Sequence, residues 1–131
     1  MEFLNPEELL GADAPQLAEE VITIRWKHPK TGKLIEREVI VREPTVEDKT
    51  EFETLVVRDQ AVDETKVRQA LIVTRTFDRQ GKRVFKPGDV EKIAKLGGGI
   101  FEPIVEAAMR LGKTSNADIT ELAKKSEATS G

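Results

Sequence analysis

Two predicted strands near the N-terminus constrain the fold most. The segment "EEVITIRWK" alternates apolar and polar side chains, which is the period of a half-buried strand, and "LIEREVIVRE" places Ile35, Val39 and Val41 on one face of a second strand. The Pro and Gly of the intervening "HPKTGK" favour a turn, so residues 21–42 are predicted to form a β-hairpin. An isolated hairpin is marginally stable in water, so one face must pack against helices or another subunit. The residues expected on that face are Ile22, Ile24, Trp26, Ile35, Val39 and Val41.

Helical patterns follow the hairpin. Pro44 ends the second strand, and Thr45 with Asp48 three residues later is typical of a capping box that starts a helix. The apolar stripe of this helix is partial, with Val46, Phe52, Leu55 and Val56. A further short helix is predicted after Pro87 and Gly88, with Asp89 as its N-cap and Val90, Ile93 and Ala94 buried.

The clearest helical period lies in "IFEPIVEAAMRL". Apolar residues recur at spacings of three and four, and Pro103 is tolerated in the first turn. The triple glycine at 97–99 is expected to end the preceding helix and turn the chain. A final element is expected from Ser115. The apolar positions of the two helices are Phe101, Ile104, Val105, Ala108 and Leu111, then Ile119, Leu122 and Ala123.

One stretch admits two interpretations. Asp63 can cap a helix in which Val67, Ala70, Leu71 and Thr74 share a face. The segment "ALIVTRTF" is nevertheless β-branched enough to be a strand that leads through "DRQG" into a second hairpin. In either case Phe77 and Phe85 flank a basic turn and are expected to anchor it to the core. The five basic residues of the 75–93 stretch are expected to line a corner facing an acidic block of a neighbouring subunit; they are Arg75, Arg79, Lys82, Arg83 and Lys86.

The predicted fold is therefore mainly α (α+β), an N-terminal β-hairpin followed by about four to five short helices in one domain. Residues 1–20 are expected to be an acidic, loosely ordered arm with at most a short helical turn. Residues 21–125 form the domain, with the helical part at 45–125, and 126–131 are a polar tail. No signal peptide and no run of about 18 apolar residues is evident, so a soluble cytoplasmic protein without membrane contacts is expected.

Composition argues against catalysis. The chain has no Cys, which removes disulfides and thiolate chemistry. Its one His, His28, removes His-based metal clusters, and a catalytic triad would have to use that residue. The "GKT" of "RLGKTS" lacks the earlier glycine of a phosphate loop, because residue 107 is Ala. The acids at 47, 48, 51 and 53 are interpreted as a solvated helix face. We expect no catalytic, cofactor or metal site.

Charge is distributed in alternating blocks. Residues 1–20 carry six acids and no base, while 21–42 carry six bases and two acids. Residues 43–66 are acidic again, and 67–95 carry eight bases and three acids. The blocks either pair internally or set the register of self-association or of a charged partner. The net charge of −3 argues against nucleic acid binding.

Trp26 is expected either to pack in the domain core or to anchor a partner. His28, beside Pro29, is expected to serve only the turn. The residues predicted as partner or self-association contacts are Trp26, Arg25, Lys27, Arg79, Lys82, Arg83, Glu7 and Glu8.

The order of these segments resembles a known family. The run "LIVTRTFDRQGKRVF", with Asp78, Gly81 and Phe85, precedes "KPGDVEKIAKL" and then "IFEPIVEAAMRL". This succession is similar to that of the tail assembly chaperones of long-tailed, lambda-like bacteriophages. The hairpin with its basic second strand, "REPTVEDKTEFE" and the closing "TELAKKSEATSG" extend the similarity over most of residues 20–126. The strongly acidic arm and the triple glycine depart from many relatives.

The resemblance implies a non-enzymatic protein that binds the tape measure protein and keeps it soluble during tail assembly in the infected host cytoplasm. It also implies absence from the mature virion, homo-oligomerisation and a longer frameshifted product that contacts the tape measure or major tail tube protein. Lys124–Lys125 and Leu111–Gly112–Lys113 are the places where a slippery sequence could encode the shift. The rival classes are a head–tail junction or tail tube component and a nucleic-acid-binding regulator.

Overall fold

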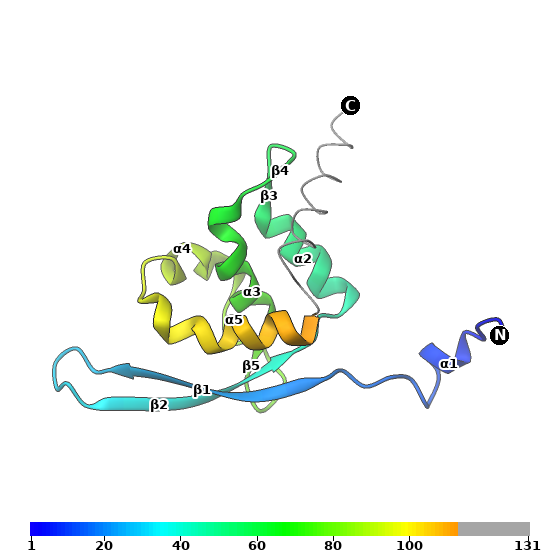
Figure 1. Ribbon diagram of the computed structural model, residues 1–131, viewed down its shortest axis with the longest axis horizontal. Helices are drawn as coiled ribbons and strands as arrows, with labels where there is room; N and C mark the ends of the chain where they lie inside the picture. The colour runs from blue at the N-terminus through cyan, green and yellow to red at the C-terminus, as the bar shows by residue number, and fades with distance from the viewer. Residues whose placement is uncertain (113–131) are drawn as a thin grey trace.

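The computed structural model describes residues 1–112, which form a sheet covered on one side by helices (Figure 1). The sheet has the strand order β1-β2-β5 and is antiparallel throughout. The predicted class, α+β with an N-terminal hairpin followed by short helices, is confirmed. The elements are α1 (Glu7–Leu10), β1 (Glu19–Lys27), β2 (Leu34–Arg42), α2 (Val46–Val56), β3 (Val57–Arg58), β4 (Ala61–Val62), η1 (Glu64–Lys66), α3 (Val67–Arg75), β5 (Thr76–Phe77), η2 (Pro87–Asp89), α4 (Val90–Ile93) and α5 (Gly98–Gly112).

The hairpin forms as predicted, two residues earlier than expected. Its register pairs Ile22 with Val39 and Trp26 with Ile35, so the expected apolar residues share one face. This face packs against α5, and Arg110 near the end of α5 is tied to Glu20 by an ion pair of 2.7 Å. We call this the inner face of the sheet.

The turn of the hairpin is held by His28. Its Nδ1 accepts hydrogen bonds from the backbone N–H groups of Lys30 and Thr31, at 3.1 and 3.3 Å. Gly32 has φ of 70°, a conformation that glycine adopts without steric cost. The expected structural role of His28 is confirmed.

Helix α2 begins with the predicted capping box. Thr45 Oγ1 accepts from the backbone N–H of Asp48, and Asp48 Oδ2 accepts from the backbone N–H of Thr45, each at 3.0 Å. Val46 was expected to be buried, but it is exposed because it lies in the first turn, directed away from the core. Asp48 was interpreted as solvated, but it is only 8% exposed.

The ambiguous stretch is both helix and strand. Residues 67–75 form α3, and the next two residues form β5, which pairs with Ile40 and Val41 of β2. Helix α3 packs against α2, α4 and α5 and buries the predicted face of Val67, Ala70, Leu71 and Thr74. Arg68 in its first turn stays exposed, whereas every residue from Ala70 to Arg75 is buried. The β-branched second half of the helix is therefore enclosed.

Helices α4 and α5 differ from expectation in detail. Val90 and Ile93 are buried, but Ala94 is exposed because α4 ends at Ile93. The carboxylate of Asp89 accepts from the backbone N–H of Lys86 at 2.8 Å instead of capping α4. The glycines do redirect the chain, although Gly98 and Gly99 already belong to α5. The buried stripe of α5 is confirmed at Phe101, Ile104, Val105 and Ala108, and Leu111 is partly buried.

The core forms one cluster between the inner face of the sheet and the helices. Phe85 reaches it and packs edge-on against Phe101, with ring centroids 6.2 Å apart. Phe77 is also buried, but it lies outside this cluster, because it pairs with Ile40 on the opposite, outer face of the sheet. Phe77 is therefore buried and Phe85 is partly buried, as expected of anchors beneath the turn, but only Phe85 packs on the main core cluster.

Within residues 1–112, no helix combines the length and hydrophobicity required to cross a membrane. The helix expected from Ser115 and the polar tail lie outside the described residues. The predicted division of the chain at residues 20 and 125 stays a prediction.

Candidate partner-binding groove

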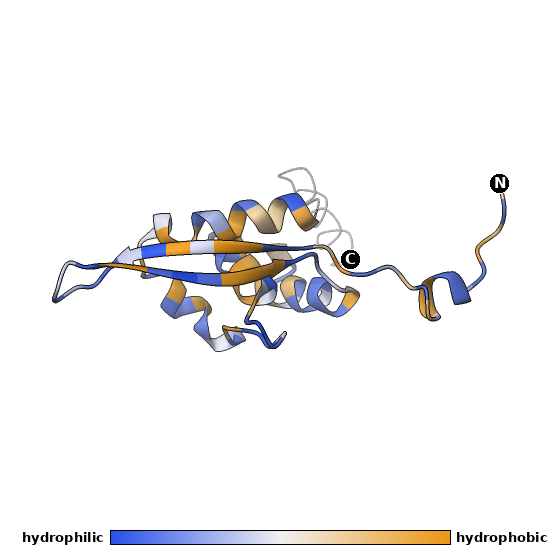
Figure 2. Cartoon of the chain, turned by 90° about the horizontal axis from the view of Figure 1, so that it is seen from below, coloured by the Kyte–Doolittle hydropathy of each residue, from blue (hydrophilic) through white to orange (hydrophobic). Residues whose placement is uncertain are grey.

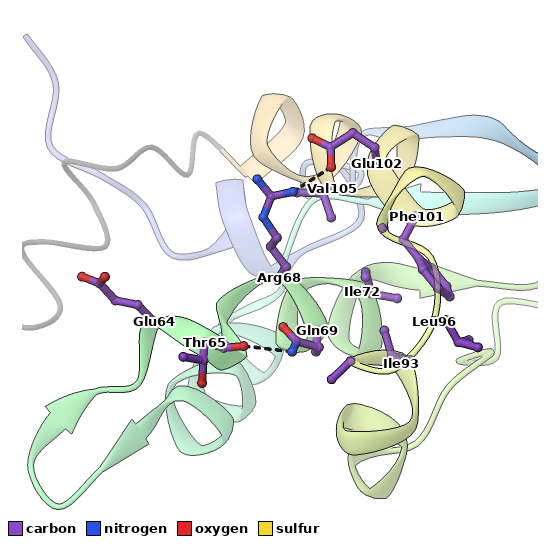
Figure 3. Close-up of a pocket in the computed structure, with 12 residues that line it drawn as sticks. Glu64, Thr65, Arg68, Gln69, Ile72, Ile93, Leu96, Phe101, Glu102 and Val105 are labelled. Carbon is purple, nitrogen blue, oxygen red and sulfur yellow. Dashed lines mark hydrogen bonds and ion pairs between the residues drawn. The ribbon is translucent and has the colours of Figure 1, made fainter.

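A groove opens on the helical side of the molecule, between α3, the α4–α5 turn and the start of α5 (Figure 3). Its volume is about 300 Å³, at the lower end of the range for small-molecule pockets. The floor consists of Ile72, Ile93, Phe101 and Val105, each at most 6% exposed. The floor therefore belongs to the rigid core.

The rim of the groove combines one apolar side chain with polar ones. Leu96, in the turn before the glycines, is 56% exposed. Opposite it, Arg68 on α3 pairs with Glu102 on α5 at 2.7 Å, a pair drawn in Figure 3. Gln69 donates to the backbone carbonyl of Thr65 at 2.8 Å. An apolar floor with a polar rim is the anatomy of a protein-binding site that takes one or two apolar side chains.

The groove was missed from the sequence. Its floor residues were assigned correctly to helices and core, but which faces meet around an opening depends on helix packing. Leu96, an apolar residue beyond the last buried turn of α4 and before three glycines, was the one available signal.

A second polar site surrounds Phe77 on the outer face. The guanidinium of Arg42 lies 4.7 Å from the Phe77 ring centroid, and that of Arg83 lies 6.0 Å from it. Arg83 is held by Asp48 and Glu51 of α2, each at 2.5 Å, and Arg42 by Glu19 at 3.1 Å. Burial by itself would lower the pKa of Arg83, but hydrogen bonds and charge from Glu51 and Asp48 raise it above its ordinary value.

Arg75 differs from the other basic residues of the 75–93 stretch. It is 3% exposed, so it does not line a surface corner as expected. Its Nη1 lies 3.4 Å from the carbonyl oxygens of Arg42 and Ala108, and its Nε has no partner among the described residues. Burial lowers the pKa of Arg75 to about 10, against the opposing charges of Asp48 and Glu43.

The predicted contact residues fall into three separate places. Arg79 and Lys82 are exposed in the turn after β5. Arg83 of the same turn already forms ion pairs within the chain, with Asp48 and Glu51. Arg25 and Lys27 project from the exposed side of β1, and Arg25 pairs with Glu36 at 3.4 Å.

Trp26 faces the opposite way, half-buried against the core. Glu7 and Glu8 lie in the first turn of α1, far from the other two places in Figure 1. Whether any of these residues binds a partner stays a prediction.

The described residues contain no group of three or more His, Cys, Asp or Glu side chains that could hold a metal ion. The molecule instead presents surfaces: an apolar groove, an uncovered sheet face and an acidic arm. An apolar groove with a polar rim and an open sheet face suit contacts with other proteins.

Comparison with known proteins identifies the family. The family model described as phage tail assembly chaperone matches residues 35–125. The chain belongs to the phage tail assembly chaperone family. Among solved structures, the tail assembly chaperone of bacteriophage HK97 is similar at 16% identity and a TM-score of 0.48, over 81% of this chain and 94% of that chain. No curated protein sequence matches this chain.

Proposed function

We propose that this chain binds the tape measure protein and keeps it soluble while the phage tail is assembled. It acts through protein contacts and self-association, without catalysis, cofactor or nucleic acid, in the cytoplasm of the infected bacterium. It leaves before the virion is mature. Family membership supports the general role, and the groove beside Leu96 is the observation that carries the specific one.

The groove suits an amphipathic helix. A helix presents apolar side chains at spacings of three and four residues, and each needs a dry hollow with a polar surround. The buried floor and the Arg68–Glu102 pair meet both needs. A long helical chain such as the tape measure protein would otherwise expose its apolar stripe and aggregate.

Self-association is supported by the edge of the hairpin. Two hydrogen bonds, His28 N–H to Lys33 O and Glu43 N–H to Ala18 O, fix the pairing of the strands at its two ends. The odd-numbered residues of β1 therefore direct their N–H and C=O groups away from β2. Since β1 is the outer strand of this sheet, nine residues without proline present an open edge. Such an edge is a template for a strand of another chain.

A variant pair tests the groove. Leu96→Asp places a charge on the groove rim, and Val46→Asp places one at an exposed apolar position on α2. With a tagged tape measure protein, Leu96→Asp should weaken capture about tenfold, the effect of losing one apolar anchor. Val46→Asp should leave capture unchanged. Equal capture by the two folded variants would remove the groove from the proposal.

The alternative function is a structural component of the head–tail junction or tail tube. Quantitative mass spectrometry of purified virions separates the two functions. The chaperone proposal expects at most trace amounts of this chain, whereas stoichiometric amounts would establish the structural alternative.

We further propose a longer product made by ribosomal frameshifting, whose extension contacts the tape measure or major tail tube protein. The coding sequence for Leu111–Gly112–Lys113 or Lys124–Lys125 should then contain a slippery heptamer. A coding sequence without one at either place would contradict this.

A further inference from the structure

The N-terminal arm carries exposed apolar side chains that its own domain does not cover. Helix α1 lies apart from the sheet and the helices (Figure 1), and none of its residues is buried. Between residues 1 and 18 the chain has four acids and no base. The large exposed apolar residues of the arm are Met1, Phe3, Leu4, Leu9, Leu10 and Leu17.

The outer face of the sheet offers a surface of matching character. Strand register places Val21 opposite Ile40, and Ile40 opposite Phe77, so one apolar residue from each strand forms a row. The helices lie behind the strands when the molecule is seen from this side (Figure 2). Val21 is 63% exposed, whereas Phe77 is only 8% exposed. The row borders a small hollow whose wall includes Glu38 and Arg79.

Positive charge at this surface is available to a partner. Within residues 1–112, Arg79 and Lys82 form no ion pair, unlike Arg42 and Arg83 of the same region. The nearest acid of the turn, Asp78, is occupied by the backbone N–H groups of residues 80 and 82. Glu38 of β2 lines the same hollow as Arg79, but neither Glu38 nor Asp78 forms an ion pair with Arg79 or Lys82 in the part of the chain that the structure describes. The turn thus presents two cations without an ion-pair partner beside an apolar row.

We infer that the acidic arm of one copy docks on the outer sheet face of a second copy, with Glu7 and Glu8 on Arg79 and Lys82 and the leucines of α1 on the apolar row. This inference rests on the self-association proposed above and names its contacts. Charge favours this surface over the groove beside Leu96, whose rim carries Glu64 and an Arg68–Glu102 ion pair that leaves no unpaired cation for the acidic arm.

The arm can reach the outer sheet face of a second copy more readily than that of its own chain. Ala18 is fixed at the start of β1, because its N–H donates to Glu43 Oε1 at 2.8 Å and its carbonyl accepts from Glu43 N–H at 2.9 Å. The arm leaves from that point away from the sheet (Figure 1). Docking on its own outer face would require the arm to reverse its direction, whereas docking on a neighbour does not.

Cysteine cross-linking tests the inference in a chain that has no native cysteine. Leu9→Cys and Arg79→Cys variants of the full chain are purified separately, mixed and oxidised. A disulfide heterodimer should form at least about tenfold faster than with Lys95→Cys, an exposed control on the helical side. The doubly substituted chain should cross-link between copies.

The outcomes separate the arm from self-association in general. Oligomers without the Leu9–Arg79 cross-link, or a disulfide closed within one chain, would overturn the arm inference and leave self-association standing. A chain that is monomeric at every concentration would overturn both. Charge reversal gives a second, independent experiment. Association should weaken in each of two double variants, Glu7→Lys/Glu8→Lys and Arg79→Glu/Lys82→Glu, and mixing the two variants should restore it. Failure of that rescue would also count against docking.

Discussion

Arg83, in the turn after β5, donates to Asp48 Oδ1 of α2 at 2.5 Å, although 34 residues separate them along the chain. The same guanidinium donates to Glu51 and lies over the Phe77 ring. This contact joins the outer face of the sheet to the first turn of α2. It explains why a turn rich in basic residues has a fixed position.

Arg83→Ala should lower the free energy of unfolding by about 2 kcal/mol, because Asp48 would remain 8% exposed without its cation. Arg79→Ala, in the same turn but exposed, should change it by less than about 0.5 kcal/mol. Urea unfolding of the two variants measures the difference. The double variant Asp48→Asn/Arg83→Ala should lose less unfolding free energy than the two single variants lose together. Strictly additive losses would contradict a direct pair.

The buried Arg75 should contribute little to stability at neutral pH. Its pKa is lowered to about 10, so between pH 10 and its higher ordinary value the unfolded chain binds more protons than the folded one. In that window stability rises with pH, and below it the full cost of burying the charge applies. Arg75→Met keeps most of the volume without the charge.

Arg75→Met should therefore be neutral or stabilising at pH 7, and its advantage over the parent chain should shrink as pH rises through about 10. Comparing the two proteins at each pH cancels the titration of the other groups. A loss of more than about 2 kcal/mol at pH 7 would show instead that the bonds to the Arg42 and Ala108 carbonyls stabilise the fold.

Gly81 should tolerate substitution poorly. It has φ of 80°, and a Cβ would lie 3.3 Å from Nη2 of Arg42. Gly81→Ala should cost about 1–2 kcal/mol from backbone strain and displacement of Arg42 from Phe77. Gly88→Ala is the control, since nothing lies within 4 Å of the added atom, and it should be within about 0.5 kcal/mol of the parent. Equal thermal shifts for the two variants would contradict this account.

Trp26 can be assigned to core or partner by one substitution. It is half-buried against the core and opposite Ile35, so Trp26→Ala should lower the unfolding free energy by about 2 kcal/mol. Leu34→Ala, at a position that is 58% exposed on the same hairpin, should change it by less than about 0.5 kcal/mol. Unfolding of both variants is followed by circular dichroism, because Trp26→Ala removes the only tryptophan and so its fluorescence signal. An unchanged stability with lost partner binding would make Trp26 an anchor.

The periodicity of apolar residues was sufficient to predict an element where only one of its faces is buried. The hairpin and α5 were predicted closely, because their apolar residues recur with the period of a strand or a helix. Helix α3 was ambiguous because its second half is rich in β-branched residues, a composition that is also typical of a strand. The pattern of "ALIVTRTF" fits helix and strand equally, and only packing decides where α3 ends.

Side-chain pairing over long sequence distances could not be predicted. Asp48 and Arg83 each belong to a charged run, and nothing local distinguishes the paired residue from its solvated neighbours. Phe77 and Phe85 flank the same turn, yet they lie on opposite sides of the sheet because only Phe77 belongs to β5. The groove likewise depends on how three helical segments meet.

The central claim is that this chain keeps the tape measure protein soluble. The most direct measurement is the soluble fraction of the tape measure protein expressed alone and together with this chain. We predict that it is mostly insoluble alone, and that it becomes mostly soluble and co-purifies with this chain when the two are expressed together. An unchanged soluble fraction, with this chain folded and present in excess, would contradict the account.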